Sequence, residues 1–203
     1  MNITRLPLGD LATNCYILSD SKSLLVFDPS AEPEVILSKL KDINLPVSAI
    51  LLTHTHYDHF GALDDVIEYS GADVYMSDIE RTWLTDIEKN GSVRYKYPIT
   101  SKAAPKLLNE GKHSIADFNF EVIHTPGHSP GSLSYKFDDF IVSGDVLFRN
   151  GVGRTDLFGG SNDDLQYSIK EKLFKLHEDT TVYAGHNVPT TIGEEKQNNP
   201  YVR

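Results

Sequence analysis

The chain has 203 residues, enough for one domain with a sizeable core. Hydrophobic residues make up 39% of it and aromatic residues 10%, and the charges are dispersed, which argues against disorder. The formal net charge of -10 and the lack of any Lys or Arg run disfavour extended contact with nucleic acid.

The location of the protein is suggested by three features of the sequence. Residues 1–10 have no sustained apolar stretch of the kind found in secretory signals, and apolar runs such as 49–52 are too short to span a bilayer. The single cysteine, Cys15, excludes an internal disulfide and is compatible with a reducing compartment. We expect a cytoplasmic protein that acts on a small molecule, without a nucleic-acid or membrane partner.

The first half of the chain alternates between strand and helix patterns. Short apolar runs predict strands, and apolar residues at helical spacing predict helices. The expected strands are 14–18, 24–27, 48–52 and 73–76, and the expected helices are 32–43, 62–69 and 78–88.

The second half begins with the alternating residues Phe118, Phe120 and Val122, which predict a strand. Further strands are expected at 132–137, 140–142 and 181–184, and a helix from Ser161 to His177. No repeat or linker interrupts the pattern, so we predict a single α/β domain over residues 1–203.

The run H-x-H-x-D-H at 54–59 follows an apolar strand. Side chains two residues apart on an extended segment point to the same side, so His54 and His56 can converge on one metal ion. Asp58 and His59 follow the turn and suit a second, adjacent ion. A solvated polar turn is the alternative. Three imidazoles and a carboxylate packed together, however, would repel or compete for protons, which favours a bound metal cation.

Three further candidate ligands each follow a glycine at the end of an expected strand: His128, Asp145 and His186. Glycine lets the backbone turn sharply and removes a side chain beside an ion. Taken alone, His128 is equally explained as a turn residue, and Asp145 or His186 alone is a weaker indication of a ligand. Their common placement at strand ends favours metal binding.

These motifs resemble those of the metallo-β-lactamase-fold hydrolases: T-H-T-H-Y-D-H at 53–59, T-P-G-H-S-P-G-S at 125–132, S-G-D at 143–145 and A-G-H at 184–186. Within that superfamily, G-R-T-D-L at 153–157, with G-E-E and N-P-Y near the C-terminus, is similar to the short glyoxalase-II-like (hydroxyacylglutathione hydrolase-like) proteins. The resemblance implies a four-layer αββα sandwich and two divalent metal ions, with zinc expected and iron or manganese open.

The resemblance also implies how the ligands are shared. One ion would be held by His54, His56 and His128, the other by Asp58, His59 and His186, and Asp145 would bridge the two. Two such ions activate a shared water, and Asp58 would orient that water as the catalytic carboxylate.

The implied substrate is a thioester of the hydroxyacyl-glutathione type, cleaved by a metal-dependent hydrolase. The segment that binds glutathione in the longer members is replaced here by residues 151–159, so a different thiol or acyl compound stays open. Arg149 and Arg154, in this glycine-rich loop, are candidates to bind an anionic substrate group. The alternative for Arg154 is a structural pair with Asp156.

Other function classes are compatible with the same fold. A mononuclear iron oxidoreductase acting on persulfides would use only part of the ligand set, whereas Asp58, His59 and His186 favour two ions. A lactone or phosphodiester hydrolase and a non-catalytic metal-binding scaffold are further alternatives. The histidines outside the motifs, His113, His124 and His177, are expected at the surface or packed.

Overall fold

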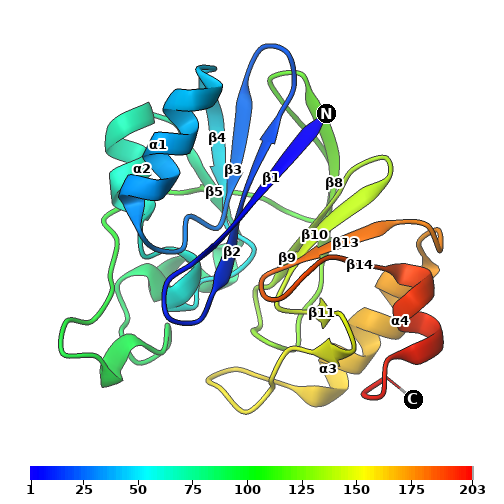
Figure 1. Ribbon diagram of the computed structural model, residues 1–203. Helices are drawn as coiled ribbons and strands as arrows, with labels where there is room; N and C mark the ends of the chain where they lie inside the picture. Colours follow the sequence, from blue (N-terminus) through cyan, green and yellow to red (C-terminus); the bar gives the residue numbers. More distant parts are fainter. Residues whose placement is uncertain (203) are drawn as a thin grey trace. The chain divides into compact units, whose positions relative to one another are not determined.

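The computed structural model describes residues 1–202, and the chain divides into two compact units. The first unit is Met1–Leu107, and the second begins at Leu108. Each unit combines one six-stranded sheet with α-helices (Figure 1). This agrees with the α/β class expected from the alternating strand and helix patterns.

The sheet of the first unit has its strands in chain order, β1 to β6. β1, β2 and β3 pair antiparallel, and β3 to β6 pair parallel. The elements are β1 (Asn2–Leu8), β2 (Thr13–Ser19), β3 (Leu24–Phe27), α1 (Pro33–Ile43), β4 (Val47–Leu51), α2 (Leu63–Ser70), β5 (Val74–Met76) and β6 (Lys106–Leu107), with 3-10 helices at Tyr57–His59, Asp78–Leu84 and Ser92–Arg94.

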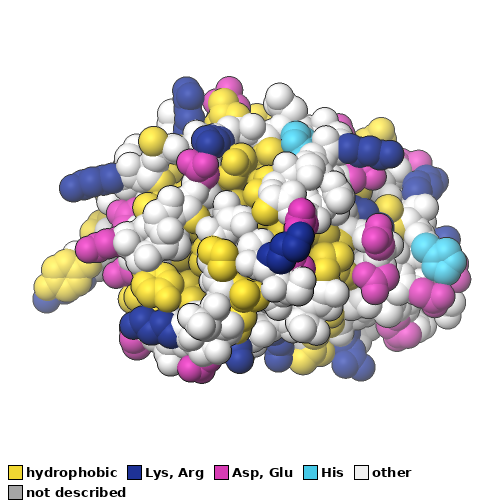
Figure 2. All heavy atoms as spheres, turned by 90° about the horizontal axis from the view of Figure 1, so that it is seen from above, with side chains coloured by type: hydrophobic (Ala, Val, Ile, Leu, Met, Phe, Trp, Pro, Cys, Tyr) yellow, Lys and Arg dark blue, Asp and Glu magenta, His cyan; other side chains and the backbone are white. Residues whose placement is uncertain are grey.

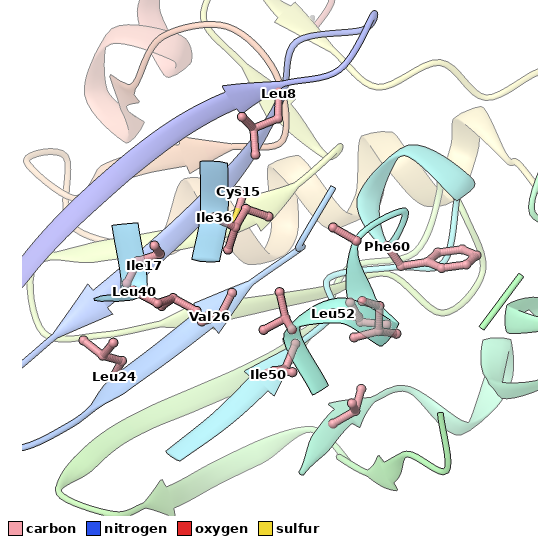
Figure 3. Packing of buried hydrophobic residues seen from close by; sticks show 14 of the residues in the cluster. Leu8, Cys15, Ile17, Leu24, Val26, Ile36, Leu40, Ile50, Leu52 and Phe60 are labelled. Atoms are coloured by element: carbon pink, nitrogen blue, oxygen red, sulfur yellow. The ribbon is translucent and has the colours of Figure 1, made fainter. Parts of the chain in front are cut away.

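The hydrophobic core of the first unit lies between this sheet and its two helices. Ile36 and Leu40 of α1 pack with Ile17 of β2, Val26 of β3 and Ile50 of β4, and all five side chains are buried (Figure 3). Apolar residues every three or four positions place one stripe of α1 against the sheet. The parallel strand β4 is thereby fixed, and its C-terminal end delivers the histidine run.

The sheet of the second unit has the strand order β14-β13-β10-β9-β8-β7. β10 and β13 pair parallel, and the other neighbours pair antiparallel. The elements are β7 (Gly111–Ile115), β8 (Phe118–His124), β9 (Leu133–Lys136), β10 (Phe140–Gly144), β11 (Leu147–Phe148), β12 (Gly151–Val152), α3 (Asn162–Tyr167), β13 (Thr181–Ala184), β14 (Thr190–Thr191) and α4 (Ile192–Asn198).

The core of the second unit packs helical residues on one face of its sheet. Leu165 of α3 and Ile192 of α4 are buried in one cluster with Ile123 of β8, Ile141 of β10 and Val182 of β13. The buried side chains of β10 and β13 fix the ends of both strands. Those ends carry two of the predicted metal ligands.

Two expected helices differ from the structure. The helix expected at 78–88 is a 3-10 helix that ends at Leu84, where the Thr85 amide and hydroxyl both bind the Thr82 carbonyl. Such local bonds compete with α-helical ones. The helix expected at 161–177 continues past Tyr167 as a π-helical turn and a 3-10 turn.

Helix α4 was not predicted, although the sequence carries a helix-start pattern at its N-terminus. The Thr191 hydroxyl accepts the Glu194 amide, as in the Thr-x-x-Glu pattern that begins many helices. The strands β1 and β7 were not predicted, and neither were the short strands β6, β11, β12 and β14. Two residues are too few to show a period.

The remaining sequence expectations concern single side chains and the surface. Cys15 is fully buried, which raises its pKa and makes it a small core residue. On the face drawn in Figure 2, basic side chains are scattered among acidic ones. Within residues 1–202, no helix is both long and apolar enough to cross a membrane.

The single-domain prediction can be tested by unfolding. Trp83, the only tryptophan, is buried in the first unit, so its fluorescence reports on that unit alone, whereas far-UV circular dichroism reports on both. We expect the two probes to give coincident urea transitions, as a cooperative domain requires. Separate midpoints would show that the units unfold independently.

Candidate metal centre

The histidine run lies directly after β4 in the first unit. His54 and His56 are 2% and 4% exposed, and their rings meet edge to face at a centroid distance of 4.8 Å. Their ligand nitrogens lie within 4.8 Å of each other. The structure therefore brings these two side chains together within this unit.

The 3-10 helix Tyr57–His59 then turns the chain back toward these rings. Its first hydrogen bond runs from the His59 amide to the His56 carbonyl at 2.9 Å. The His59 ring lies 4.0 Å from the His54 ring, and its Nε2 lies 3.5 Å from Oδ2 of Asp58. This single turn thus brings four possible ligands together after one strand, namely His54, His56, Asp58 and His59.

Asp28 directly follows β3 and orients this group of side chains. Its side chain is buried, and its Oδ2 lies 2.9 Å from Nδ1 of His59. It also accepts the Thr53 amide and the Thr53 hydroxyl, both at 2.7 Å. A carboxylate at Nδ1 leaves Nε2 as the ligand atom and makes the imidazole a stronger base.

Glu80 supports the backbone between His54 and His56. The side chain is fully buried, and its Oε2 accepts the Thr55 amide and the Thr55 hydroxyl, each at 2.8 Å. The Thr55 side chain therefore points away from the two histidines on either side of it, as alternation along an extended segment requires.

Both buried acids were missed as functional residues. Asp28 had a local signal, since the Asp-Pro pair ends a wholly buried strand. Glu80 had none, because an acid in a polar 3-10 helix is ordinarily expected at the surface.

In the second unit, Asp145 lies between two histidines. Its Oδ2 is 3.5 Å from Nε2 of His128 and 3.3 Å from Nε2 of His186. Asp145 follows β10, His186 follows β13, and His128 lies in the loop between β8 and β9. The parallel pairing of β10 with β13 brings their C-terminal ends together, as expected for residues at strand ends.

The glycines before these ligands have two different roles. Gly127 has φ +139°, and a Cβ there would come within 2.3 Å of the Leu165 backbone, so only glycine fits. Gly144 also has positive φ, which confirms the expected turn. Gly185 instead donates its amide to the Gly144 carbonyl and ties the two ligand-bearing strand ends together.

The loop after Asp145 contacts His128 through its backbone. The Arg154 carbonyl lies 2.8 Å from Nδ1 of His128, which again leaves Nε2 as the ligand atom. The Arg154 guanidinium forms two 2.7 Å hydrogen bonds to the Asp156 carboxylate, and both side chains are exposed. This bidentate contact lowers the Asp156 pKa to about 2. Arg149 is also exposed.

Glu195 of α4 holds this loop in place. Its side chain is buried and accepts the Asn150 amide at 2.9 Å, the Thr190 hydroxyl at 2.5 Å and the Asn199 amide group at 2.8 Å. Asn199 also donates to the Gly151 carbonyl. The G-E-E and N-P-Y motifs are therefore structural, because they join the C-terminal helix to the loop beside Asp145.

Substitution of Arg154 separates its backbone and side-chain roles. In Arg154→Ala the carbonyl that contacts His128 remains, and we expect the Asp156 pKa to rise from about 2 toward its ordinary value, measured by NMR titration. If the guanidinium also binds an anionic substrate group, KM rises by about tenfold or more. An unchanged KM would limit the side chain to its pair with Asp156.

The donor set of both units fits divalent metal ions. Imidazole nitrogens and carboxylate oxygens are the ligands of zinc, iron and manganese. The Nε2 atoms of His54, His56 and His59 are all buried. The rings of His54, His59 and His128 each have a contact at Nδ1. The histidines outside the motifs lie in other surroundings. His113 and His124 contact backbone carbonyls, and His177 is exposed.

Comparison with known proteins identifies the family. The profile of the Metallo-beta-lactamase superfamily matches residues 8–186. The chain is 43% identical over 206 residues to the probable metallo-hydrolase YqgX of Bacillus subtilis, covering 100% of this chain and 98% of that protein. It is 34% identical over 208 residues to the hydroxyacylglutathione hydrolase GloC of Haemophilus influenzae, again covering 100% and 98%.

Solved structures show the same fold. BLEG-1, a B3 metallo-beta-lactamase, is 44% identical with a TM-score of 0.95, and the match covers 99% of each chain. TTHA1623, in a di-iron-bound form, is 33% identical with a TM-score of 0.89 over 98% of this chain and 100% of that one. ETHE1 from Myxococcus xanthus is 28% identical with a TM-score of 0.81 over 98% and 84%. The expected metallo-β-lactamase fold is confirmed, and the chain belongs to the metallo-beta-lactamase superfamily as a metallo-hydrolase with metal-binding histidines and aspartates.

Proposed function

We propose that this protein uses two divalent metal ions, with zinc expected, to hydrolyse small-molecule thioesters. The observation that carries the proposal is the position of Asp145, whose one oxygen lies within 3.5 Å of both His128 and His186. A carboxylate placed between two imidazoles suits a bridge between two ions. With the four donors of the first unit, the chain offers seven ligands, more than the four that one zinc ion takes.

The proposed sharing of ligands keeps residues together that are in contact within the first unit, His54 with His56 and Asp58 with His59. His54 and His56 would hold one ion together with His128, and the adjacent Asp58 and His59 would hold the other together with His186. Membership of the metallo-beta-lactamase superfamily supports this sharing of ligands.

The two bound ions would supply a water of lowered pKa and polarise the substrate carbonyl. The residues of the chain orient the ligands and handle protons. The Thr13 hydroxyl donates to Oδ2 of Asp58 at 2.7 Å and restrains this carboxylate, the proposed acceptor of the water proton. Asp28 and the Arg154 carbonyl restrain His59 and His128 in the same way.

A thioester is favoured as substrate for two reasons. A thiolate is an easy leaving group, and the chain matches a hydroxyacylglutathione hydrolase over its whole length at 34% identity. The thiol part is left open because the loop at 151–159 differs from the glutathione-binding segment of longer relatives.

A panel of thioesters tests this proposal. Glutathione, coenzyme A and small-thiol thioesters would be assayed with the metal content measured on the same samples. We expect two ions per chain and hydrolysis of at least one thioester, lost on chelation and restored by zinc. Lactones and phosphodiesters belong in the panel as controls for the other hydrolase classes.

A mononuclear iron oxidoreductase acting on persulfides, with one iron per chain, is the second candidate. The similarity to TTHA1623, crystallised in a di-iron-bound form, makes iron a reasonable ion for these ligands. This candidate predicts iron in the purified protein, oxygen uptake with a persulfide and no hydrolysis of thioesters. That result would replace the hydrolase proposal.

A further inference from the structure

A cavity of about 230 Å³ lies beside Asp58 within the first unit. It is lined by the turn that follows β1, by the 3-10 helix of the metal ligands and by the segment that leads to Ile99. Asp58, the proposed ligand and proton acceptor, forms part of its wall. A group bound in this cavity would therefore lie next to the reacting centre that we propose.

Two tyrosines form one wall of the cavity. The hydroxyl oxygens of Tyr57 and Tyr95 are 2.6 Å apart, and their rings lie 4.8 Å apart between centroids. The wall is thus an aromatic surface whose polar ends already bond each other.

Buried hydrogen bonds hold this wall in position. The Asn90 side chain, which is fully buried, donates to the carbonyls of Trp83 and Ile99 at 3.0 Å each. Ser92, also fully buried, exchanges hydrogen bonds of 3.1 Å with the backbone of Ile99. The segment from Asn90 to Ile99 is therefore closed on itself, and Tyr95 lies on a preorganised loop.

The lining of the cavity is apolar, neutral polar or acidic, with Thr13 and Ser30 contributing hydroxyl groups. Leu8, Leu11 and Ile99 contribute apolar surface, and Asp10 and Asp58 are the charged residues. Among the described residues that line it, none is basic. No basic side chain of the lining compensates a carboxylate for its lost hydration, and Asp10 repels it, whereas an uncharged apolar group gains free energy from burial.

The size of the cavity limits what it can take. Whole ligands of drug size occupy pockets of roughly 300–1,000 Å³, so about 230 Å³ suits only part of a substrate. We infer that this cavity binds an uncharged, apolar substituent of the thioester, and that the Tyr57–Tyr95 wall with Leu11 selects it against anionic substituents. This inference rests on the proposed function.

Binding of unreactive analogues tests the inference. Ketones in which a methylene replaces the thioester sulfur would be titrated calorimetrically into the metal-loaded protein. One pair of ketones carries a phenyl or a carboxylate on the acyl side, and a second pair carries them on the thiol side. We expect the phenyl compound of one pair to bind at least about tenfold tighter than its carboxylate partner, and that pair identifies the side that enters the cavity.

Two arginine variants give a matched comparison. Leu11→Arg places a cation at the cavity, where Leu11 is 50% exposed, and should abolish or reverse the preference. Leu107→Arg makes the same change on β6, at 41% exposure and outside the lining, and should keep it. Tyr95→Ala removes part of the aromatic wall and should weaken binding of the phenyl compound about tenfold.

The outcomes separate the inference from the proposed function. Equal binding of phenyl and carboxylate compounds, no binding of either, or the same behaviour in both arginine variants would overturn the inference. A clear apolar preference without hydrolysis of any thioester would leave the cavity assignment standing and overturn the proposed function instead.

Discussion

Replacing His56 by alanine is expected to lower thioester turnover about a thousandfold while the protein stays folded. His56 is a proposed ligand of one ion, and a bound metal contributes several kcal/mol of transition-state stabilisation. The bound metal should fall from two ions per chain to about one. Turnover, elemental analysis and circular dichroism measure the three effects.

A histidine outside the site provides the control. His177 is 80% exposed and its ring lies 3.6 Å from Asp179, so His177→Ala should keep both ions and full turnover. Asp58→Ala should lose turnover in the same way as His56→Ala. If His56→Ala and Asp58→Ala both retained two ions and wild-type rates, the assignment of the histidine run as the metal site would be wrong.

Replacing Asp28 by alanine is expected to destabilise the protein by about 3 kcal/mol. The change leaves the Thr53 amide, the Thr53 hydroxyl and the His59 ring without the buried acceptor that they now share. For a chain of this length, that loss lowers Tm by roughly 6–12 °C. Differential scanning calorimetry of the wild type and the variant measures the shift.

Asp28 should also affect the metal. Loss of an outer partner of a ligating histidine typically weakens metal binding about 10–100-fold. Asp28→Asn keeps the side-chain volume, and it should show the weaker metal affinity even if the alanine variant fails to fold. Asp20 accepts two backbone amides at the surface, so Asp20→Ala is the matched control with little expected effect. Unchanged metal affinity in Asp28→Asn would remove Asp28 from the positioning of His59.

The run from His54 to His59 was predictable because its geometry is local. Side chains two apart on an extended segment share a side, and a single turn brings the next two ligands back. In the first unit the rings of this run lie close together, with centroid distances of 4.8 and 4.0 Å. The core helix α1 was predictable because its apolar spacing reports which side is buried, and strand β3 because it is a continuous apolar run.

The buried acids could not be predicted in the same way. Asp28, Glu80 and Glu195 each accept hydrogen bonds from residues distant in the chain, and without those donors each would be expected at the surface. The contact of the Arg154 carbonyl with His128 was equally unpredictable, whereas the pair of its guanidinium with Asp156 was among the expected alternatives.

The sequence by itself determined the kinds of ligand and the order in which strands deliver them, because these depend on residue type and short-range period. The tertiary structure alone decided which atoms of those ligands are left for a metal and what surrounds Asp58. The Nδ1 contacts of His59 and His128, the pair of Tyr57 with Tyr95 and the cavity beside them all join residues far apart in the chain. No local pattern encodes such contacts, because they form only when the sheet has brought the segments together.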